Sequence, residues 1–425
     1  MTQTVEHAPA LFGTITLPAD KSVAHRTAML ASLAEGTSRI ANYPASADPQ
    51  STLACLRSLG AEITEEDGIL IVEGRGLHGL QAPDGPLDCG NSGTTMRLLS
   101  GILAGQPFDS TLTGDASLSR RPMGRVQVPL AQMGAHLDLT DGHAPIHIRG
   151  GAALNGIEYK LPVPSAQVKS CVLLAGLFAE GETTVVETAP SRDHTERMLG
   201  LDAVEMDGAR YLTVEGGRPI APRTWAVPRD FSAAAFFLVA GSIVPEGTVR
   251  LPGVGLNPSR SGLLSILRAM GADVRVENER ERGGEPLGDL NVRAARLHGV
   301  SVGGDVVPNL IDEIPVLAVA AACAEGRTEV RDAAELRVKE TDRIDAMAKN
   351  LRALGAEVEE FEDGFAINGP CTLRGATVES YDDHRIAMAM GVAGLVASGS
   401  TTIVDAECAK VSFPDFWTTL QALRP

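Results

Sequence analysis

The chain has 425 residues, of which 44% are hydrophobic, and its 45 glycines and 25 prolines are typical of a turn-rich globular protein of two or three domains. A formal net charge of −17 at pH 7 disfavours nucleic acid or an anionic membrane as the main partner. The start of the chain shows no basic segment followed by an apolar run, and no apolar stretch is long enough to span a bilayer, so we expect a cytoplasmic protein.

Cysteine and lysine usage narrows the class of ligand. The six cysteines show neither a CxxC pair nor a Cys/His metal spacing, so we expect buried thiols in a reducing cytoplasm and no metal site. Lysine is scarce in this acidic chain, and the complete set is Lys21, Lys160, Lys169, Lys339, Lys349 and Lys410. Because several of these lysines fall in motifs, the sequence predicts a local basic pocket for a small anionic ligand.

Six segments share one pattern, in which a polar cluster starts an apolar helix that is followed by a glycine and a strand. The first segment reads DKSVAHRTAMLASLAEGTSRI and the sixth reads DHRIAMAMGVAGLVASGSTTI. We expect the glycines to end these helices, since glycine adopts positive φ without a Cβ clash. They recur about every 70 residues, at Gly36, Gly105, Gly181, Gly247, Gly326 and Gly399.

A second helix in each copy ends in a motif such as LRSLGAEI or LRALGAEV, and an alternating run such as Ile69–Val72 or His147–Arg149 then predicts a strand. A repeat of this size cannot bury all its apolar faces alone, so the copies should pack around the helices that are apolar nearly all round. We predict two groups of three repeats, with the boundary near Arg223–Arg229, where the stretch APRTWAVPRD supplies two prolines. The strand expected at Leu11–Leu17 could complete either group.

The fifth repeat contains a charged stretch just before a helix. Apolar residues at three- and four-residue steps over Ile344–Leu354 predict an amphipathic helix that runs to Gly355. Thr341 or Asp342 is the expected N-cap.

This assignment places Lys339, Glu340 and Arg343 at or just before the first helical turn. A helix N-terminus offers unpaired N–H groups and a partial positive charge, so the two cations there favour an anion site. A solvated ion-pair ladder, with Glu335 bound to Lys339, explains the local sequence equally well.

The six apolar helices of the repeats also begin with groups that could bind an anion, except for the fourth helix, DFSAAAFF. If the repeats aim these helices alike, their N-termini converge on a cleft between the two groups of repeats. The polar groups at the other five starts are Lys21 and Arg26; Thr94, Thr95 and Arg97; Ser165, Gln167 and Lys169; Asp312 and Glu313; Asp383, His384 and Arg385.

Several motifs remain ambiguous when taken singly. Gly90–Arg97 is a glycine-rich turn into a helix, which suits an oxyanion, but it is neither a Walker loop nor a GxGxxG motif. Arg120–Arg125 crowds three arginines around a proline, and Ser191–Arg197 reads mostly as a charged helix start. His384 could act as a general base or be a structural histidine.

In combination, these motifs resemble the 5-enolpyruvylshikimate-3-phosphate synthase family of enolpyruvyl transferases. The matching segments are DKSVAHR, GNSGTTMR, SRRPMG, SAQVKS, SRDHTERM, LRVKETDRI and YDDHRIAM, in order along essentially the whole chain. The resemblance implies an α/β fold of two inside-out prisms with three repeats each. The domains would be residues 19–226, mainly for shikimate 3-phosphate, and residues 1–18 plus 227–425, with the active site in the cleft between them.

The resemblance also implies the reaction: transfer of the enolpyruvyl group of phosphoenolpyruvate to the 5-hydroxyl of shikimate 3-phosphate, with release of phosphate and without a metal or organic cofactor. Shikimate 3-phosphate would be bound by Ser22, Arg26, Ser165, Gln167, Asp312 and Lys339. Phosphoenolpyruvate or its phosphate would be bound by Lys21, Gly93, Arg121, Arg343, Arg385 and Lys410. Further substrate-binding residues would be Thr94, Ala166, Arg192 and His384.

The chemistry implied is addition followed by elimination through a tetrahedral ketal. Asp312 would take the proton of the 5-hydroxyl, and Glu340 would protonate the methylene carbon and later deprotonate the methyl group. Lys21 or Lys410 would assist the departing phosphate. Each acid–base role is worth roughly 10²–10⁴ in rate.

Two positions depart from commoner members of the family, in which serine often stands at Ala166 and asparagine at Glu335. Gly93 is the small residue typical of glyphosate-sensitive members, so we expect inhibition by glyphosate that competes with phosphoenolpyruvate. No extensive sticky surface is evident in the sequence, and we expect a monomer.

Two alternatives remain at this stage. The related transferase that acts on UDP-N-acetylglucosamine usually carries a reactive cysteine on a mobile loop and a Lys-Asn opening. Here Arg120–Arg125 contains no cysteine, and Ser22 follows Lys21. A catalytically silent anion-binding scaffold would be expected to lack Asp312 or Glu340, and both are present.

Overall fold

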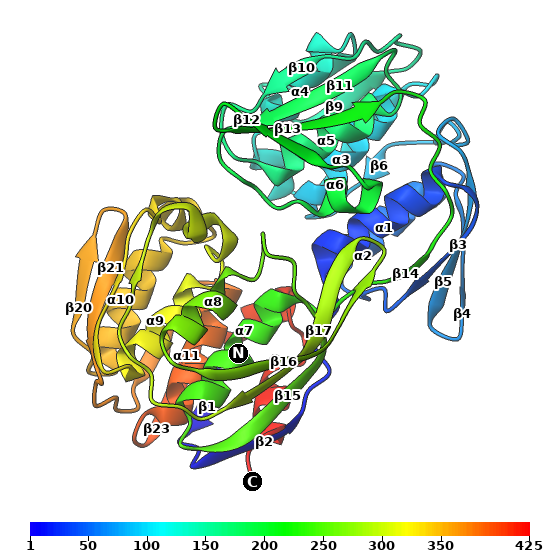
Figure 1. Cartoon of the computed structure of the whole chain (residues 1–425). Coiled ribbons are helices and arrows are strands. Elements are labelled where there is room, and N and C mark those ends of the chain that lie inside the picture. The colour runs from blue at the N-terminus through cyan, green and yellow to red at the C-terminus, as the bar shows by residue number, and fades with distance from the viewer. The chain divides into compact units, whose positions relative to one another are not determined.

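The computed structural model describes all 425 residues, which divide into two compact units (Figure 1). The N-terminal unit consists of Ala19–Pro228 and Glu281–Glu285. The C-terminal unit consists of Met1–Pro18, Arg229–Arg280 and Pro286–Pro425. This division differs from the expected domain limits at residues 227–228 and at the five residues from Glu281 to Glu285.

The N-terminal unit contains three four-stranded sheets, with strand orders β14-β3-β5-β4, β6-β7-β9-β8 and β10-β11-β13-β12. Its strands are β3 (Glu35–Ala41), β4 (Glu62–Glu66), β5 (Ile69–Arg75), β6 (Leu87–Asp88), β7 (Ser110–Thr113), β8 (His136–Thr140), β9 (His143–Arg149), β10 (Glu158–Lys160), β11 (Glu182–Glu187), β12 (Ala203–Met206), β13 (Ala209–Glu215) and β14 (Thr224–Ala226). Its helices are α1 (Lys21–Leu33), α2 (Ala47–Ser58), α3 (Gly93–Ala104), α4 (Gly124–Gln132), α5 (Ala166–Gly176) and α6 (His194–Leu199), with the 3-10 helix η1 (Leu118–Arg120).

The C-terminal unit repeats this plan with sheets of order β16-β17-β15-β2, β18-β19-β21-β20 and β1-β23-β22. Its strands are β1 (Gln3–Glu6), β2 (Ala10–Thr14), β15 (Glu246–Gly255), β16 (Asp273–Arg282), β17 (Glu285–Arg293), β18 (Ser301–Val302), β19 (Gly326–Val330), β20 (Val358–Phe361), β21 (Gly364–Gly369), β22 (Thr377–Glu379) and β23 (Ser400–Val404). Its helices are α7 (Phe231–Ile243), α8 (Gly262–Ala269), α9 (Ile314–Cys323), α10 (Arg343–Ala353), α11 (His384–Val396) and α12 (Phe416–Ala422), with the 3-10 helices η2 (Gly304–Asn309), η3 (Ala334–Val338) and η4 (Ala406–Val411).

Each of the six sheets contains one pair of parallel strands. Some of these pairs join segments that are far apart in the sequence. In the first sheet β14 pairs parallel with β3, so the segment just before Pro228 returns to the first repeat. In the fourth repeat β2 pairs parallel with β15, and in the sixth repeat β1 pairs antiparallel with β23. The start of the chain therefore completes the C-terminal unit, which decides the question that the sequence left open.

The six apolar helices form the two cores, as predicted. In the C-terminal unit α7, α9 and α11 pack on one another (Figure 1). Nearly all residues of these three helices are buried. In the N-terminal unit α3 and α5 approach so closely that a Cβ on Gly101 would lie 2.2 Å from the carbonyl oxygen of Cys171. The fold is thus a mixed α/β architecture of six repeats, three in each unit.

The expectation that the repeat glycines end these helices is wrong for five of the six helices. Five of the helices end earlier, at C-caps in or near extended or ordinary helical geometry, such as Ala34 with φ −73° and ψ 161°. Gly105 does cap α3, but its φ is −95° and therefore not left-handed. Glycines such as Gly36, with φ +120°, instead lie at the start of the strand that follows the helix, where Gly36 is the second residue of β3. Left-handed glycines directly after a helix occur at the second helices, for example Gly200 with φ +64°.

No helix is both long and apolar enough to cross a membrane. The six cysteines are free thiols, and four of them are buried, whereas Cys323 and Cys371 are half-buried.

Candidate active site

The charged stretch of the fifth repeat begins α10 in the manner predicted. Asp342 is the N-cap, and its carboxylate accepts a hydrogen bond of 3.1 Å from the N–H group of Asp345. The helix starts at Arg343, and Gly355 follows its end with φ +97°. The cap at Asp342 therefore fixes Arg343 as the first residue of α10.

Arg343 is the centre of a group of carboxylates in the C-terminal unit, although its side chain is only 1% exposed. Its guanidinium donates to Asp383 (Nε to Oδ2, 2.8 Å), to Glu340 (Nη2 to Oε2, 2.6 Å) and to Asp312 (Nη1 to Oδ1, 3.3 Å). Burial opposes the positive charge, but the three carboxylates outweigh it and raise the pKa of Arg343 above its ordinary value. One buried cation thus holds Asp312 and Glu340, the two residues to which the resemblance gives acid–base roles.

Arg385 joins the same group from the first turn of α11. Its Nη1 donates to the carbonyl oxygen of Asp312 at 3.0 Å, and its Nη2 lies 3.8 Å from Asp312 Oδ2. Behind it, Arg260 makes two hydrogen bonds of 3.0 Å to the buried carboxylate of Glu313. These contacts fix Arg385 and Asp312 relative to each other.

Lys339, His384 and Lys410 lie outside the hydrogen bonds of Arg343. Lys339 pairs with Glu335 at 2.7 Å, so the ion-pair ladder considered from the sequence is present, and both ends are at least partly accessible to solvent. Lys410 is exposed on η4, which packs against α11. His384 is the first residue of α11 and is half-buried.

In the N-terminal unit, α1 presents three predicted residues in its first two turns. Asp20 caps the helix by accepting from the N–H of Val23 at 3.0 Å, as expected. Lys21 pairs with Asp48 at 3.1 Å, and both side chains are 30% exposed. Ser22 is half-buried beside Lys21.

Arg26 is more deeply embedded than a surface ligand-binding arginine. Its guanidinium donates to Thr195 Oγ1 (2.7 Å), Ser170 Oγ (2.8 Å) and the carbonyl oxygen of Ser22 (2.8 Å). Burial lowers the pKa of Arg26 to about 10. Two of its five N–H groups are left over once these bonds are made.

The glycine-rich turn and the turn before α5 are joined by one chain of hydrogen bonds. Arg97 Nη1 donates to Gln167 Oε1 at 2.6 Å, and Gln167 Nε2 donates to Thr94 Oγ1 at 3.0 Å. A Cβ on Gly93 would lie 2.8 Å from Arg97 Nη1 and 3.5 Å from Arg121 Nη1. The absence of a side chain at Gly93 therefore leaves room for two guanidinium groups.

Arg121 is positioned through the same turn. Its Nη2 donates to Asn91 Oδ1 at 2.7 Å, and Asn91 Nδ2 donates to Asp115 at 2.8 Å. The N–H of Leu118 and the amide of Asn91 lower the pKa of Asp115. Arg121 itself forms no ion pair, so its charge is available to an anion.

Ser165 caps α5 by accepting from the N–H of Val168 at 3.4 Å, and its hydroxyl hydrogen is free to donate elsewhere. Ala166 and Gln167 follow at the half-buried start of the helix, and Arg192 is half-buried before α6. The N-terminal unit thus brings together the groups around Gly93, Arg121 and Gln167, whereas Lys21 and Asp48 form a separate pair.

The predicted set of site residues omitted two that the structure places at its centre. Arg97 is 7% exposed, and burial together with the nearby charges of Arg125 and Arg121 lowers its pKa to about 10. Asp383 is fully buried and accepts a hydrogen bond of 2.8 Å from Arg343 Nε. Both residues were visible in the sequence as polar groups at helix starts, but nothing local showed that they hold other site residues.

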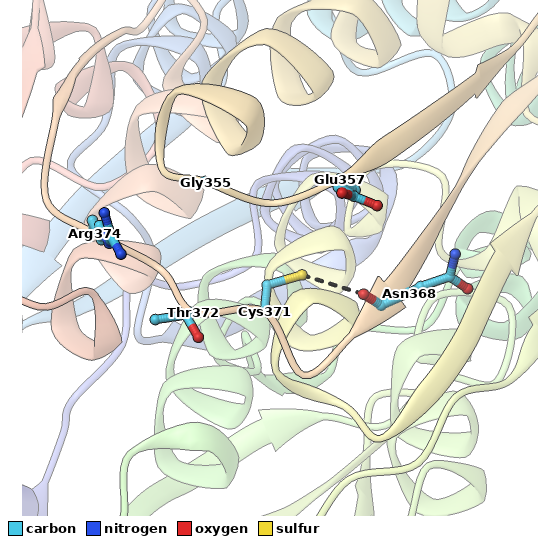
Figure 2. Close-up of a pocket in the computed structure, with 6 residues that line it drawn as sticks. All are labelled: Gly355, Glu357, Asn368, Cys371, Thr372 and Arg374. Carbon is cyan, nitrogen blue, oxygen red and sulfur yellow. Dashed lines mark hydrogen bonds between the residues drawn. The ribbon is translucent and has the colours of Figure 1, made fainter.

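A pocket of the C-terminal unit with a volume of about 480 Å³ lies elsewhere. It is lined by Gly355, Glu357, Asn368, Cys371, Thr372 and Arg374 (Figure 2). The Cys371 thiol donates to the Asn368 carbonyl oxygen at 3.4 Å. No predicted site residue lines this pocket. Its lining contains one arginine, Arg374, and one glutamate, Glu357, so the pocket does not suit a pair of anions.

Each unit therefore exposes arginine or lysine side chains beside helix starts, and the C-terminal unit adds two carboxylates fixed on one arginine. This combination of cations and carboxylates is typical of an enzyme that binds anionic substrates and transfers protons.

Comparisons with known proteins identify the family. Residues 5–420 match the family model of EPSP synthase (3-phosphoshikimate 1-carboxyvinyltransferase). The chain is 63% identical to the 3-phosphoshikimate 1-carboxyvinyltransferase of Salinibacter ruber, with 99% of each chain covered, and 55% identical to that of a Synechococcus species, with 99% of this chain and 96% of the relative covered. The chain belongs to the EPSP synthase family, as the motifs predicted, and is a transferase.

Solved structures agree. An EPSP synthase from Acinetobacter baumannii superposes with a TM-score of 0.93 at 45% identity, covering 100% of this chain and 98% of that chain. The enolpyruvyl transferase NikO from Streptomyces tendae matches with a TM-score of 0.76 at 20% identity, covering 99% of this chain and 96% of that chain, which shows the shared fold.

Proposed function

We propose that the chain transfers the enolpyruvyl group of phosphoenolpyruvate to the 5-hydroxyl of shikimate 3-phosphate and releases phosphate, using the residues described above. This is the reaction of the EPSP synthase family, a step of the shikimate pathway toward aromatic amino acids. The observation that carries the assignment of roles is the Arg343 group, in which one buried guanidinium holds both Asp312 and Glu340.

Shikimate 3-phosphate is assigned mainly to the N-terminal unit. Ser22, Ser165 and Gln167 offer hydroxyl and amide groups that suit a polyol, and Arg26 retains donors beyond its bonds to the protein. Ala166 and Arg192 belong to the same assignment because of their positions in the matched motifs. Lys339 would contribute a positive charge from the C-terminal unit.

Phosphoenolpyruvate is assigned to the arginines and lysines that flank the glycine-rich turn and the Arg343 group. In the N-terminal unit these are Lys21, Arg121 and the Gly93–Thr94 turn. In the C-terminal unit they are Arg343, His384, Arg385 and Lys410. Both substrates are anions, so the enzyme must neutralise their repulsion before their reacting atoms can meet.

The chemistry then needs two proton-transfer groups. Asp312 takes the proton of the 5-hydroxyl as that oxygen attacks C2 of phosphoenolpyruvate, while Glu340 delivers a proton to the methylene carbon, which gives the tetrahedral ketal. Elimination reverses the role of Glu340, which removes a proton from the new methyl group as the C2–O bond to phosphate breaks. Lys21 or Lys410 stabilises the departing phosphate.

Contacts of these two carboxylates fit their roles. Asp312 is 15% exposed and lies between Arg343 and Arg385, so its position is fixed. The Glu340 side chain is 52% exposed, so it can exchange protons with solvent between turnovers.

Phosphate release tests the function directly. The full-length chain is assayed with phosphoenolpyruvate and either shikimate 3-phosphate or UDP-N-acetylglucosamine as acceptor. We expect release with shikimate 3-phosphate alone. Release with UDP-N-acetylglucosamine only would favour the sister activity, and release with neither acceptor would favour an anion-binding scaffold.

Two further assignments rest on membership of the family: the protein is a monomer, and it is located in the cytoplasm. A third assignment is inhibition by glyphosate in competition with phosphoenolpyruvate, which is supported by the small residue at Gly93. An inhibition constant in the millimolar range would contradict the glyphosate assignment, and sedimentation velocity would test the monomer.

A further inference from the structure

Two buried hydroxyl groups hold Arg26 in the N-terminal unit. Arg26 Nε donates to Thr195 Oγ1 at 2.7 Å, and its Nη2 donates to Ser170 Oγ at 2.8 Å. Thr195 lies on α6 and Ser170 on α5, and each is 1% exposed. We call these two residues the hydroxyl clamp. Neither belongs to the predicted set of site residues, although both lie in the motifs SRDHTERM and SAQVKS.

The directions of the hydrogen bonds in the clamp follow from the number of hydrogen atoms available. The Ser170 hydroxyl donates to the carbonyl oxygen of Ala166 at 2.6 Å, which uses its single hydrogen. The hydroxyl oxygens of Thr195 and Ser170 are 2.7 Å apart, so Thr195 is the donor of the bond between them. Both oxygens therefore remain acceptors, and they receive two of the N–H groups of Arg26.

The clamp is neutral, so it orients Arg26 without cancelling its charge. Arg26 is 4% exposed and forms no ion pair, since its acceptors are the two hydroxyl oxygens and the carbonyl oxygen of Ser22. Burial, partly offset by the charges of Glu196 and Glu285, lowers the pKa of Arg26 to about 10, so the guanidinium is still charged at neutral pH. A carboxylate in the clamp would compete with an anionic substrate for this charge, whereas a hydroxyl group does not.

A buried ion pair keeps the clamp in place. Lys169 precedes Ser170 on α5, and its Nζ lies 2.6 Å from Oε1 of Glu196. Glu196 follows Thr195 on α6, and the side chains of the ion pair are 0% and 3% exposed. Because α6 has only six residues, it depends on its packing against α1 and α5 rather than on its own stability. The ion pair and the hydroxyl pair are thus adjacent links between α5 and α6, and they set the position of Thr195.

We propose that Thr195 and Ser170 are positioning residues for shikimate 3-phosphate: they orient the Arg26 guanidinium so that its two remaining N–H groups bind oxygen atoms of this substrate. The inference rests on the proposed function, in which Arg26 contacts shikimate 3-phosphate. Without the Thr195 hydroxyl, Arg26 Nε has no acceptor and the guanidinium is free to turn away. A displacement of about 1 Å in a binding group can cost about a hundredfold.

The variant Thr195→Val removes the hydroxyl group and keeps the shape of the side chain. The full-length variant is assayed by steady-state phosphate release with each substrate varied, and its dissociation constant for shikimate 3-phosphate is measured by isothermal titration calorimetry without phosphoenolpyruvate. We expect the dissociation constant and the KM for shikimate 3-phosphate to rise by about tenfold or more. The kcat and the KM for phosphoenolpyruvate should change by less than about threefold.

Three further variants locate the effect. Thr195→Ser keeps the hydroxyl group and should restore the affinity for shikimate 3-phosphate. Thr183→Val is the matched control, because Thr183 lies in the same unit, is 0% exposed and has a hydroxyl group without a hydrogen-bond partner. It should leave both KM values unchanged. Ser170→Ala removes the other half of the clamp and should also raise the KM for shikimate 3-phosphate, so it decides the question if Thr195→Val does not fold, as judged by circular dichroism.

A merely structural role of Thr195 predicts a different result. Partial unfolding lowers the concentration of active enzyme and therefore the apparent kcat, but it leaves the KM for shikimate 3-phosphate unchanged. An unchanged KM and dissociation constant for shikimate 3-phosphate in Thr195→Val or in Ser170→Ala would overturn the proposal, as would an equal loss of affinity in Thr195→Ser.

Failure of the clamp and failure of the proposed function give different results. A wild-type chain that releases phosphate, together with clamp variants of unchanged affinity, would contradict the clamp alone. A wild-type chain that releases no phosphate would contradict the proposed function. If that chain still bound shikimate 3-phosphate, and Thr195→Val bound it about tenfold more weakly, the positioning of Arg26 by the clamp would be supported.

Discussion

Replacing Glu340 by glutamine isolates the proton-transfer step from the geometry of the site. The Glu340 carboxylate accepts a hydrogen bond of 2.6 Å from Arg343. The amide oxygen of glutamine can accept the same bond, so the position of the side chain should be kept, whereas its capacity to give and take a proton is lost. General acid–base catalysis contributes about 10²–10⁴ in rate, which corresponds to about 3–5 kcal/mol of activation free energy. We therefore expect kcat to fall by that factor while both KM values change less than about threefold.

The assay is steady-state phosphate release with both substrates varied. Because the side chain is 52% exposed, the free energy of unfolding should change by less than about 1 kcal/mol. Asp345→Asn is the matched control, since Asp345 also lies in an ion pair on α10, with Lys349 at 2.7 Å, and has no role in the mechanism. A kcat within threefold of the wild type in Glu340→Gln would remove Glu340 from the mechanism.

Three further predictions follow from individual contacts. Gly93→Ala should raise the KM for phosphoenolpyruvate and the inhibition constant for glyphosate by about tenfold or more. The reason is that the new Cβ would lie 2.8 Å from Arg97 Nη1 and displace that guanidinium. Unchanged values of both constants would contradict this prediction. Lys169→Met should destabilise the chain by about 3–5 kcal/mol, since it removes the buried ammonium that pairs with the carboxylates of Glu187 and Glu196, whereas Lys160→Met at an exposed position should have little effect; thermal denaturation compares them. Burial lowers the pKa of His25 from 6.5 to about 3, so the unfolded chain binds a proton that the folded chain excludes between these values. The contribution of His25 to the free energy of unfolding is therefore fully present above pH 6.5 and is lost as the pH falls towards 3. At pH 5 about 2 kcal/mol of this contribution is lost. Urea unfolding at pH 7 and pH 5 should show a smaller loss in His25→Gln, and an equal loss would refute the assignment.

The repeat pattern shows where local reasoning succeeds and where it fails. Apolar character all round a helix predicts burial, because such a helix has no face that water can solvate, and α7, α9 and α11 are buried accordingly. The glycine pattern does not by itself locate a helix end, since a glycine with positive φ occurs at the start of a strand as well as after a helix. Gly36 in β3 illustrates the first position and Gly355 the second.

The contacts of the site residues also fall into two groups: those between near neighbours in the sequence, which the sequence predicts, and those between distant residues, which it does not. Asp342 as the N-cap of α10 and the pairing of Glu335 with Lys339 depend on neighbours within four residues, so the sequence was sufficient. Arg97 binds Gln167 across 70 positions, and Arg343 binds Asp383 across 40, so no local pattern could reveal these contacts.

What the sequence by itself determined is the list of chemical groups, the sixfold repeat and the family, because motifs and periodicity are properties of the chain order. Only the tertiary structure decided which of these groups share a hydrogen bond, and that the chain start completes the C-terminal unit through β1 and β2. The physical reason is that long-range pairing depends on how helices and strands pack, and packing brings together side chains whose separation in sequence carries no information about their distance in space.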